Sequence, residues 1–198
     1  CAPKLINDYY GHNMIEISDL GNKSFHDFII KKKDKFKNYK DLIKLILKVQ
    51  KIKIKKKYKF GKYEIKLKSY SLRNLHKESD LFFDWYLKYN LKIKNITRIK
   101  KNLKNELNNI YKKIYFKNAY FTHRDFHASN IMIRKKKLCI IDSQDAIIGN
   151  PLYDLASLID DVRIKLPNKL KKDLFNYYVA KSKFKNNYNI LKNDFDIL

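Results

Sequence analysis

Three polar side chains with the spacing of a phosphoryl-transfer site lie in the second half of the chain. Asp125 and Asn130 belong to the segment HRDFHASN, which has the spacing H-x-D-x-x-x-x-N, and Asp142 follows at the end of an apolar run. In such sites one carboxylate accepts the proton of the attacking hydroxyl, and two further oxygen ligands hold Mg²⁺. The spacing therefore predicts Asp125 as catalytic base and Asn130 and Asp142 as metal ligands.

Turns alone could place these residue types at strand ends, because Asp and Asn are common there. A second group of residues makes chance a poor explanation. Asp142 opens the segment DSQDA, Gly149 opens GNP, and Asp154 opens DLA. Phosphoryl transfer needs positioning and charge neutralisation rather than covalent help, and hard oxygen ligands suit magnesium.

The whole stretch from His123 to Ala156 resembles the aminoglycoside phosphotransferase and choline kinase-like family, whose signature is H-x-D-x-x-x-x-N followed by I-D-x-x-x-A-x-x-G-x-P-x-x-D-L-A. The segments HRDFHxxN and DxQDA, with ESDLFFDWY at 78–86, are most similar to bacterial kinases that phosphorylate N-acetylmuramate or N-acetylglucosamine on the anomeric hydroxyl. The resemblance implies an α+β, protein kinase-like fold, mainly the helical C-lobe with a catalytic β-hairpin. Residues 1–20 would be remnant N-lobe strands and the hinge, and residues 21–198 the phosphotransferase C-lobe.

The resemblance also implies roles for residues outside the triplet. ATP and Mg²⁺ would be the cofactors, and the backbone of Glu16, Ile17 and Ser18 would meet adenine at the hinge. Asp154 would support the loop by accepting hydrogen bonds from its backbone or from His123.

Five further side chains are candidates for contact with the acceptor or with phosphate: Arg124, His127, Asp145, Glu78 and Trp85. Sugar hydroxyls bind to carboxylates, and sugar faces pack on aromatic rings. The same residue types are common on helix surfaces and in cores. Packing of His127, and pairing of Arg124 with a carboxylate, are equally good interpretations.

The residues by which the family's N-lobe binds phosphate have no recognisable counterpart in this sequence. The four glycines form no G-x-G-x-x-G, and no strand lysine precedes the expected hinge. The chain also starts with Cys1 rather than methionine. We therefore expect either a fragment of a larger protein or a degenerate kinase, which by itself would bind ATP poorly.

The composition limits the partners. The net charge of +25 arises from 45 Lys and Arg against 20 Asp and Glu. Lysine is spread along the chain and no nucleic-acid-binding motif is visible, so we expect no specific nucleic acid partner. The sequence has neither a long apolar run nor a secretory signal, which predicts a cytoplasmic protein without a membrane partner. Cys1 and Cys139 are expected to be free thiols, Cys139 buried.

Periodicity predicts the elements that position these residues. Strands are expected at 3–6, 13–17, 119–122, 131–133 and 138–141, and helices after Ser24, over 39–52, 75–89 and 96–114, and after Pro151 and Pro167. The lysine-rich stretch around Gly61 is expected to be a loop. The aromatic residues of 75–89 and one face of 96–114 are expected in the core.

The leading hypothesis is an ATP-dependent kinase that acts on a hydroxyl of a small molecule, with an amino sugar as the favoured acceptor. An aminoglycoside, choline or homoserine is an alternative acceptor. A third hypothesis is a catalytically impaired fragment or pseudokinase that binds a partner or RNA.

Overall fold

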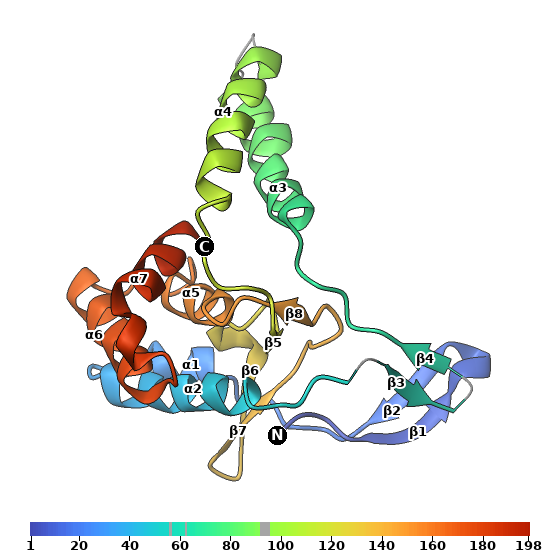
Figure 1. Cartoon of the computed structure of the whole chain (residues 1–198). Coiled ribbons are helices and arrows are strands. Elements are labelled where there is room, and N and C mark those ends of the chain that lie inside the picture. Colours follow the sequence, from blue (N-terminus) through green and yellow to red (C-terminus); the bar gives the residue numbers. More distant parts are fainter. Residues whose placement is uncertain (56, 62, 92–95) are drawn as a thin grey trace.

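The computed structural model describes residues 1–55, 57–61, 63–91 and 96–198, and it combines helices with short antiparallel strands (Figure 1). The α-helices are α1 (Phe25–Ile29), α2 (Phe36–Val49), α3 (Leu72–Leu81), α4 (Ile96–Tyr111), α5 (Tyr153–Ile159), α6 (Asn168–Lys181) and α7 (Tyr188–Ile197). A π-helical segment, η2 (Phe82–Asn90), continues α3, and short 3₁₀ turns are η1 (Tyr10–His12), η3 (Ala128–Asn130) and η4 (Lys185–Asn187). The strands are β1 (Leu5–Tyr9), β2 (Met14–Ile17), β3 (Tyr58–Phe60), β4 (Tyr63–Ile65), β5 (Tyr120–Thr122), β6 (Ile131–Arg134), β7 (Lys137–Ile140) and β8 (Ile147–Gly149).

The body of the molecule is built from α1, α2, α5, α6 and α7 (Figure 1). Its core is one cluster of buried apolar side chains, and it includes Phe126, Ala128 and Ile131 from the segment that carries the sequence motif. Phe126 and Ile131 have no exposed surface. The helices therefore hold the loop 123–130 in place, because apolar residues of the loop pack in the helical core.

Two antiparallel strand pairs flank that loop. β5 pairs with β8, and β6 pairs with β7 in a register that sets Ile131 opposite Ile140. A two-residue turn joins β6 to β7, in which Lys135 and Lys136 have φ of 46° and 63°, as a type I′ hairpin turn requires. Gly149 of β8 has no room for a side chain, because a Cβ there would lie 2.5 Å from Oγ1 of Thr122.

A helical hairpin, formed by α3, η2 and α4, projects from the body (Figure 1). Its two arms are joined by polar contacts. Lys104 pairs with Asp80 at 2.6 Å, and Nε2 of His76 lies 3.4 Å from Oδ1 of Asn108. The N–H of Leu91 donates to the carbonyl of Tyr86, the i to i+5 bond of a π-helix.

Most of the expected elements are confirmed, including β5, β6, β7 and the helix that begins after Ser24, whereas β8 has no counterpart among the expected strands. The side chain of Ser24 accepts a hydrogen bond from the N–H of Asp27, as an N-cap does. The expected loop around Gly61 is partly wrong, because β3 and β4 pair there and Gly61 has φ of 54°. Residues 56 and 62 of that stretch lie outside the described residues.

The expectation that the aromatic residues of the second helix lie in the core is wrong. Four of them are 47% to 65% exposed, namely Phe82, Trp85, Tyr86 and Tyr89. They share one face of η2, whereas Phe83 and Leu87 are buried. The expected buried face of the next helix is likewise wrong, since no described residue of α4 is buried. Each arm of the hairpin packs mainly against the other, so only a narrow stripe can be covered.

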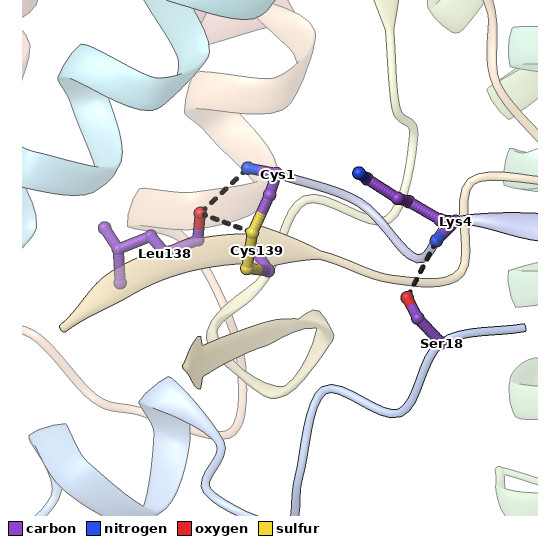
Figure 2. The surroundings of a disulfide bond; sticks show 5 residues. All are labelled: Cys1, Lys4, Ser18, Leu138 and Cys139. Atoms are coloured by element: carbon purple, nitrogen blue, oxygen red, sulfur yellow. Dashed lines mark hydrogen bonds between the residues drawn. A yellow bond between two sulfur atoms is a disulfide. The ribbon is translucent and has the colours of Figure 1, made fainter. Parts of the chain in front are cut away.

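The two cysteines are also not free thiols, because Cys1 and Cys139 form a disulfide (Figure 2). Sequence separation gave no reason to pair them, because they are 138 positions apart. The N-terminal segment lies along β7, where the N–H of Ile140 donates to the carbonyl of Cys1 at 2.7 Å. Figure 2 also shows the N–H of Lys4 donating to Oγ of Ser18 at 2.9 Å. These contacts bring the segment after β2 to the side of the β6–β7 pair.

No helix in the described part of the chain is both long enough and apolar enough to cross a membrane.

A buried carboxylate fixes the connection from the helical hairpin to β5. The N–H groups of Tyr115 and Phe116 donate to the two oxygens of Asp194 at 2.8 and 2.9 Å, and the amide of Asn150 donates at 3.1 Å. Asp194 belongs to α7 and has no exposed surface. This carboxylate therefore joins the C-terminal helix to the segment leading into the motif.

Asp194→Asn should lower the free energy of unfolding by about 3 kcal/mol, because one amide oxygen cannot accept all three bonds and a buried donor is left unpaired. Urea unfolding measures the effect. Asp196→Asn, an exposed position on the same helix, should change stability by less than about 0.5 kcal/mol. Equal effects of the two substitutions would contradict this account of Asp194.

Candidate active site

The loop 123–130 runs from the end of β5 to the start of β6 and leaves one carboxylate in solvent. Thr122, His123 and Phe126 are buried, whereas Asp125 between them is exposed. The carbonyl of Asp125 accepts hydrogen bonds from the N–H of His127 and from the side-chain amide of Asn130, both at 3.0 Å. The backbone of Asp125 is thus held on the body while its side chain is accessible.

Asp154, at the start of α5, holds the beginning of this loop. Its carboxylate accepts hydrogen bonds from the N–H of His123 at 2.9 Å and from the N–H of Arg124 at 3.1 Å. Burial raises the pKa of Asp154 to about 7, although the two N–H groups oppose this rise. Both acceptor oxygens therefore serve the backbone rather than solvent.

His123 joins the loop to the second strand pair. Its Nε2 donates to the carbonyl of Ile141 at 2.9 Å. Burial lowers the pKa of the imidazole, and the nearby carboxylates of Asp125 and Asp142 oppose this. The buried imidazole of His123 thus lies near the predicted base and one predicted metal ligand.

Asn130 and Asp142 meet at the open end of the β6–β7 pair. The N–H of Ile141 donates to the carbonyl of Asn130 at 3.0 Å, and Asp142 is the next residue. Asp142 has a left-handed backbone, with φ of 65°, a region that Asp tolerates better than most residues. Its side chain is exposed and accepts a bond from the amide of Gln144. The amide nitrogen of Asn130 is used within the loop, and its oxygen can serve as a ligand.

This donor set fits a magnesium ion better than a softer metal. It offers one amide oxygen and one carboxylate, and Mg²⁺ binds through one or two protein carboxylates together with phosphate oxygens and water. Among the described residues, no group of three or more His, Cys, Asp or Glu side chains could hold a metal ion. A dedicated all-protein metal cage is therefore not what these residues form.

Two of the predicted acceptor contacts bind each other instead. Nη2 of Arg124 donates to Oε1 of Glu78 at 2.8 Å. The other carboxylate oxygen of Glu78 accepts hydrogen bonds from the hydroxyls of Tyr153, at 3.0 Å, and Tyr70. Sequence analysis did not single out either tyrosine, because a lone tyrosine gives no sequence signal of a partner that lies far along the chain.

The remaining candidates are more scattered. His127 is half-buried beside Asn130, with Nε2 3.4 Å from the amide nitrogen, and burial lowers its pKa. Asp145 is exposed between Asp142 and β8. Trp85 lies on η2 in the projecting hairpin, 65% exposed and in contact with the ring of Tyr89. The structure thus does not bring Trp85 to the loop.

The predicted hinge leads into a segment that bonds to the edge of the β6–β7 pair. Glu16 and Ile17 end β2 and are exposed, and Ser18 is bonded to Lys4 through its side chain and its N–H. Shortly afterwards the carbonyl of Lys23 accepts a bond from the N–H of Ile133 at 2.8 Å. The chain therefore passes directly from this segment onto the edge of β6.

Five cavities formed by described residues are lined by neither Asp125 nor Asn130 nor Asp142. One of about 680 Å³ is lined by residues of α2, of α6 and the segment after it, and by Tyr120 of β5, with five lysines and three aromatic rings. Another, of about 470 Å³, lies between α5 and α7 and includes Tyr153 and Ser157. The second cavity adjoins the loop 123–130, because Oγ of Ser157 donates to the carbonyl of Arg124 at 3.4 Å.

The raised pKa of Asp154 predicts a pH dependence of stability. The folded state holds this proton more tightly than the unfolded chain, in which the pKa is about 3.8, so the resulting stabilisation is present at low pH and is lost as the pH rises through about 7. The difference in unfolding free energy between wild type and Asp154→Asn should therefore become smaller from pH 5 to pH 7.5. Urea unfolding at several pH values measures it, with Asp173→Asn, an exposed position on α6, as control. A difference that grows with pH would contradict the prediction.

The sequence was compared with known proteins. The pattern of the phosphotransferase enzyme family, APH, matches residues 34–185. The chain is 22% identical over 182 residues to an N-acetylmuramate/N-acetylglucosamine kinase of Neisseria meningitidis serogroup B, covering 92% of this chain and 53% of that protein. It is 27% identical over 116 residues to a protein of the same name from Pseudomonas aeruginosa, covering 59% of this chain and 34% of that protein.

The chain thus spans about half the length of the first of these relatives and about a third of the second. The family match contains the loop 123–130, the β6–β7 pair and Asp154, all of which the geometry above connects. The chain belongs to the phosphotransferase enzyme family.

Proposed function

We propose that this chain is the catalytic part of an ATP-dependent kinase that transfers the γ-phosphate to a hydroxyl of a small molecule. The observation that carries the proposal is the arrangement around His123. An exposed Asp125 follows a loop start that Asp154 holds through two backbone hydrogen bonds. Asn130 and Asp142 lie at the open end of the adjoining strand pair. Membership in the phosphotransferase enzyme family supports the same reaction class.

In this proposal Asp125 accepts the proton of the acceptor hydroxyl while the hydroxyl oxygen bonds to the γ-phosphorus. The bond between the γ-phosphorus and the bridging oxygen breaks, and ADP leaves. The loop contributes by positioning. Its backbone is held at His123, Arg124 and Asp125, so the carboxylate needs little reorganisation before it can accept the proton.

Asn130 and Asp142 would hold Mg²⁺, which when bound neutralises phosphate charge. Asn130 directly precedes β6 and Asp142 lies two residues after β7, so the ladder of this hairpin sets their spacing. Glu16, Ile17 and Ser18 would offer backbone groups to adenine. We further propose the division of the chain into the end of an N-lobe with the hinge, residues 1–20, and a C-lobe of protein kinase-like fold, residues 21–198.

The proposed acceptor is an amino sugar. Its support is twofold: both relatives carry the name N-acetylmuramate/N-acetylglucosamine kinase, and the motif wording of this chain resembles such kinases. The identities of 22% and 27% leave the acceptor to be determined by assay. Magnesium-dependent ADP release should therefore be measured in the full-length protein with N-acetylmuramate, N-acetylglucosamine, aminoglycosides, choline and homoserine.

Asp125→Asn in the full-length protein should reduce kcat by about a hundredfold to ten-thousandfold with the best acceptor of this panel, because general base catalysis supplies a factor of that order. ADP release under saturating ATP measures the loss. Asp173→Asn, exposed on α6, should leave kcat within about twofold. Unchanged turnover in Asp125→Asn would exclude it as the base, and an inactive wild type that binds no ATP would favour a pseudokinase.

Substitution of the proposed metal ligands should change the magnesium requirement. Loss of a residue that only supports a metal ligand already costs about tenfold or more in metal affinity. Loss of a direct ligand, in Asp142→Asn or Asn130→Ala, should therefore raise the Mg²⁺ concentration for half-maximal activity by at least that factor. A magnesium titration at fixed ATP measures it. If both variants need the same Mg²⁺ concentration as wild type for half-maximal activity, neither side chain holds the ion.

A further inference from the structure

We propose that Glu78 is a positioning residue for the catalytic base: through Arg124 it holds the loop that presents Asp125, and it thereby makes the α3 arm of the helical hairpin a working part of the active site. The proposal rests on the proposed function, because it concerns the placement of the proposed base. Glu78 belongs to α3, far along the chain from the loop that it contacts.

Three donors bind the carboxylate of Glu78. Oε1 accepts from Nη2 of Arg124 at 2.8 Å, and Oε2 accepts from the hydroxyl of Tyr153 at 3.0 Å and from that of Tyr70. Burial raises the pKa of Tyr153 to about 12, and it also raises the pKa of Tyr70, so both hydroxyls keep their protons and act as donors. A carboxylate has about four acceptor sites, so three donors leave Glu78 little capacity to accept a sugar hydroxyl as well.

The three donors come from different parts of the fold. Tyr70 lies just before α3, Tyr153 begins α5 and Arg124 belongs to the loop 123–130. The rings of Tyr70 and Tyr153 pack edge to face, with centroids 5.1 Å apart. Glu78 therefore joins the base of the projecting hairpin, the helix that carries Asp154 and the loop that carries Asp125.

Arg124 needs such support because its backbone is left-handed, with φ of 75°. This region costs a residue other than glycine of the order of 1 kcal/mol and persists only where surrounding contacts enforce it. Its N–H is bound by Asp154, its carbonyl accepts from Ser157, and its guanidinium is bound by Glu78. Asp125 is the next residue, so its direction depends on how firmly Arg124 is held.

Loss of the Glu78 charge should therefore affect the chemical step more than substrate binding. In the full-length protein, Glu78→Gln should lower kcat by about tenfold to a hundredfold, since small misplacement of a catalytic group has costs of this order, and change the KM for ATP by less than about threefold. Glu106→Gln, exposed on the other arm of the same hairpin, is the matched control and should leave both constants within about twofold. A raised KM for the acceptor with unchanged kcat would overturn the proposal and make Glu78 an acceptor ligand.

A double-mutant cycle tests whether Glu78 acts through Arg124. If it does, Glu78→Gln should cause less than about a twofold further loss of kcat when Arg124 is already alanine, because the interaction is already gone. Losses that multiply would show that the two residues act independently and would overturn the proposal. Tyr153→Phe, which removes one donor to Glu78, should give a smaller loss than Glu78→Gln.

Amide hydrogen exchange separates this proposal from the function on which it rests, because it requires no turnover. In Glu78→Gln, exchange across residues 123–127 should become about tenfold faster, while exchange in α2 and α4 stays as in wild type. This result would support the positioning role even if no acceptor of the panel were phosphorylated. Unchanged exchange in the loop, or an equal increase across α4, would overturn the positioning role and leave Glu78 with a structural role in the hairpin.

Discussion

The buried carboxylate of Asp154 determines the path of the chain between β5 and β6. Two consecutive N–H groups, those of His123 and Arg124, point at this one side chain. Consecutive N–H groups converge on one acceptor only where the backbone leaves the extended conformation. Arg124, the second of these two residues, then has a left-handed backbone. Phe126 then enters the core and leaves the intervening Asp125 exposed. The alternation of buried and exposed residues in the loop thus follows from one electrostatic contact and one apolar anchor.

The helical hairpin has a different relation to the body. Polar contacts such as Lys104 with Asp80 and His76 with Asn108 join its two arms. In α3, η2 and α4 only Phe83 and Leu87 of the described residues are buried. Little hydrophobic energy therefore fixes its orientation, because that energy scales with the apolar area removed from water. The contacts at its two ends have to compensate: Glu78 holds α3 to the loop, and Asp194 of α7 holds the segment that follows α4.

Local patterns in the sequence predicted the elements well, whereas partners distant in sequence stayed hidden. The strands around Asn130 and Asp142 and the N-cap at Ser24 depend on neighbouring residues, and such signals can be read directly. Periodicity also located η2 and α4, but it cannot tell whether the apolar face of a helix packs against a core. In η2 and α4 most apolar side chains do not. The pairing of Cys1 with Cys139 depends on tertiary proximity. The same holds for Glu78, which the sequence marked as chemically interesting without showing that its partner is Arg124.

The type I′ turn of the β6–β7 hairpin separates two kinds of sequence change. The turn at Lys135 and Lys136 lies at the end of the ladder opposite to Asn130 and Asp142, so an insertion at its tip leaves these two proposed metal ligands where they are. A single residue inserted between Lys137 and Asp142 would instead reverse which side of the strand each side chain faces. Homologous chains can therefore vary freely in the length of this turn. The number of residues from Lys137, where β7 begins, to Asp142 has to stay fixed.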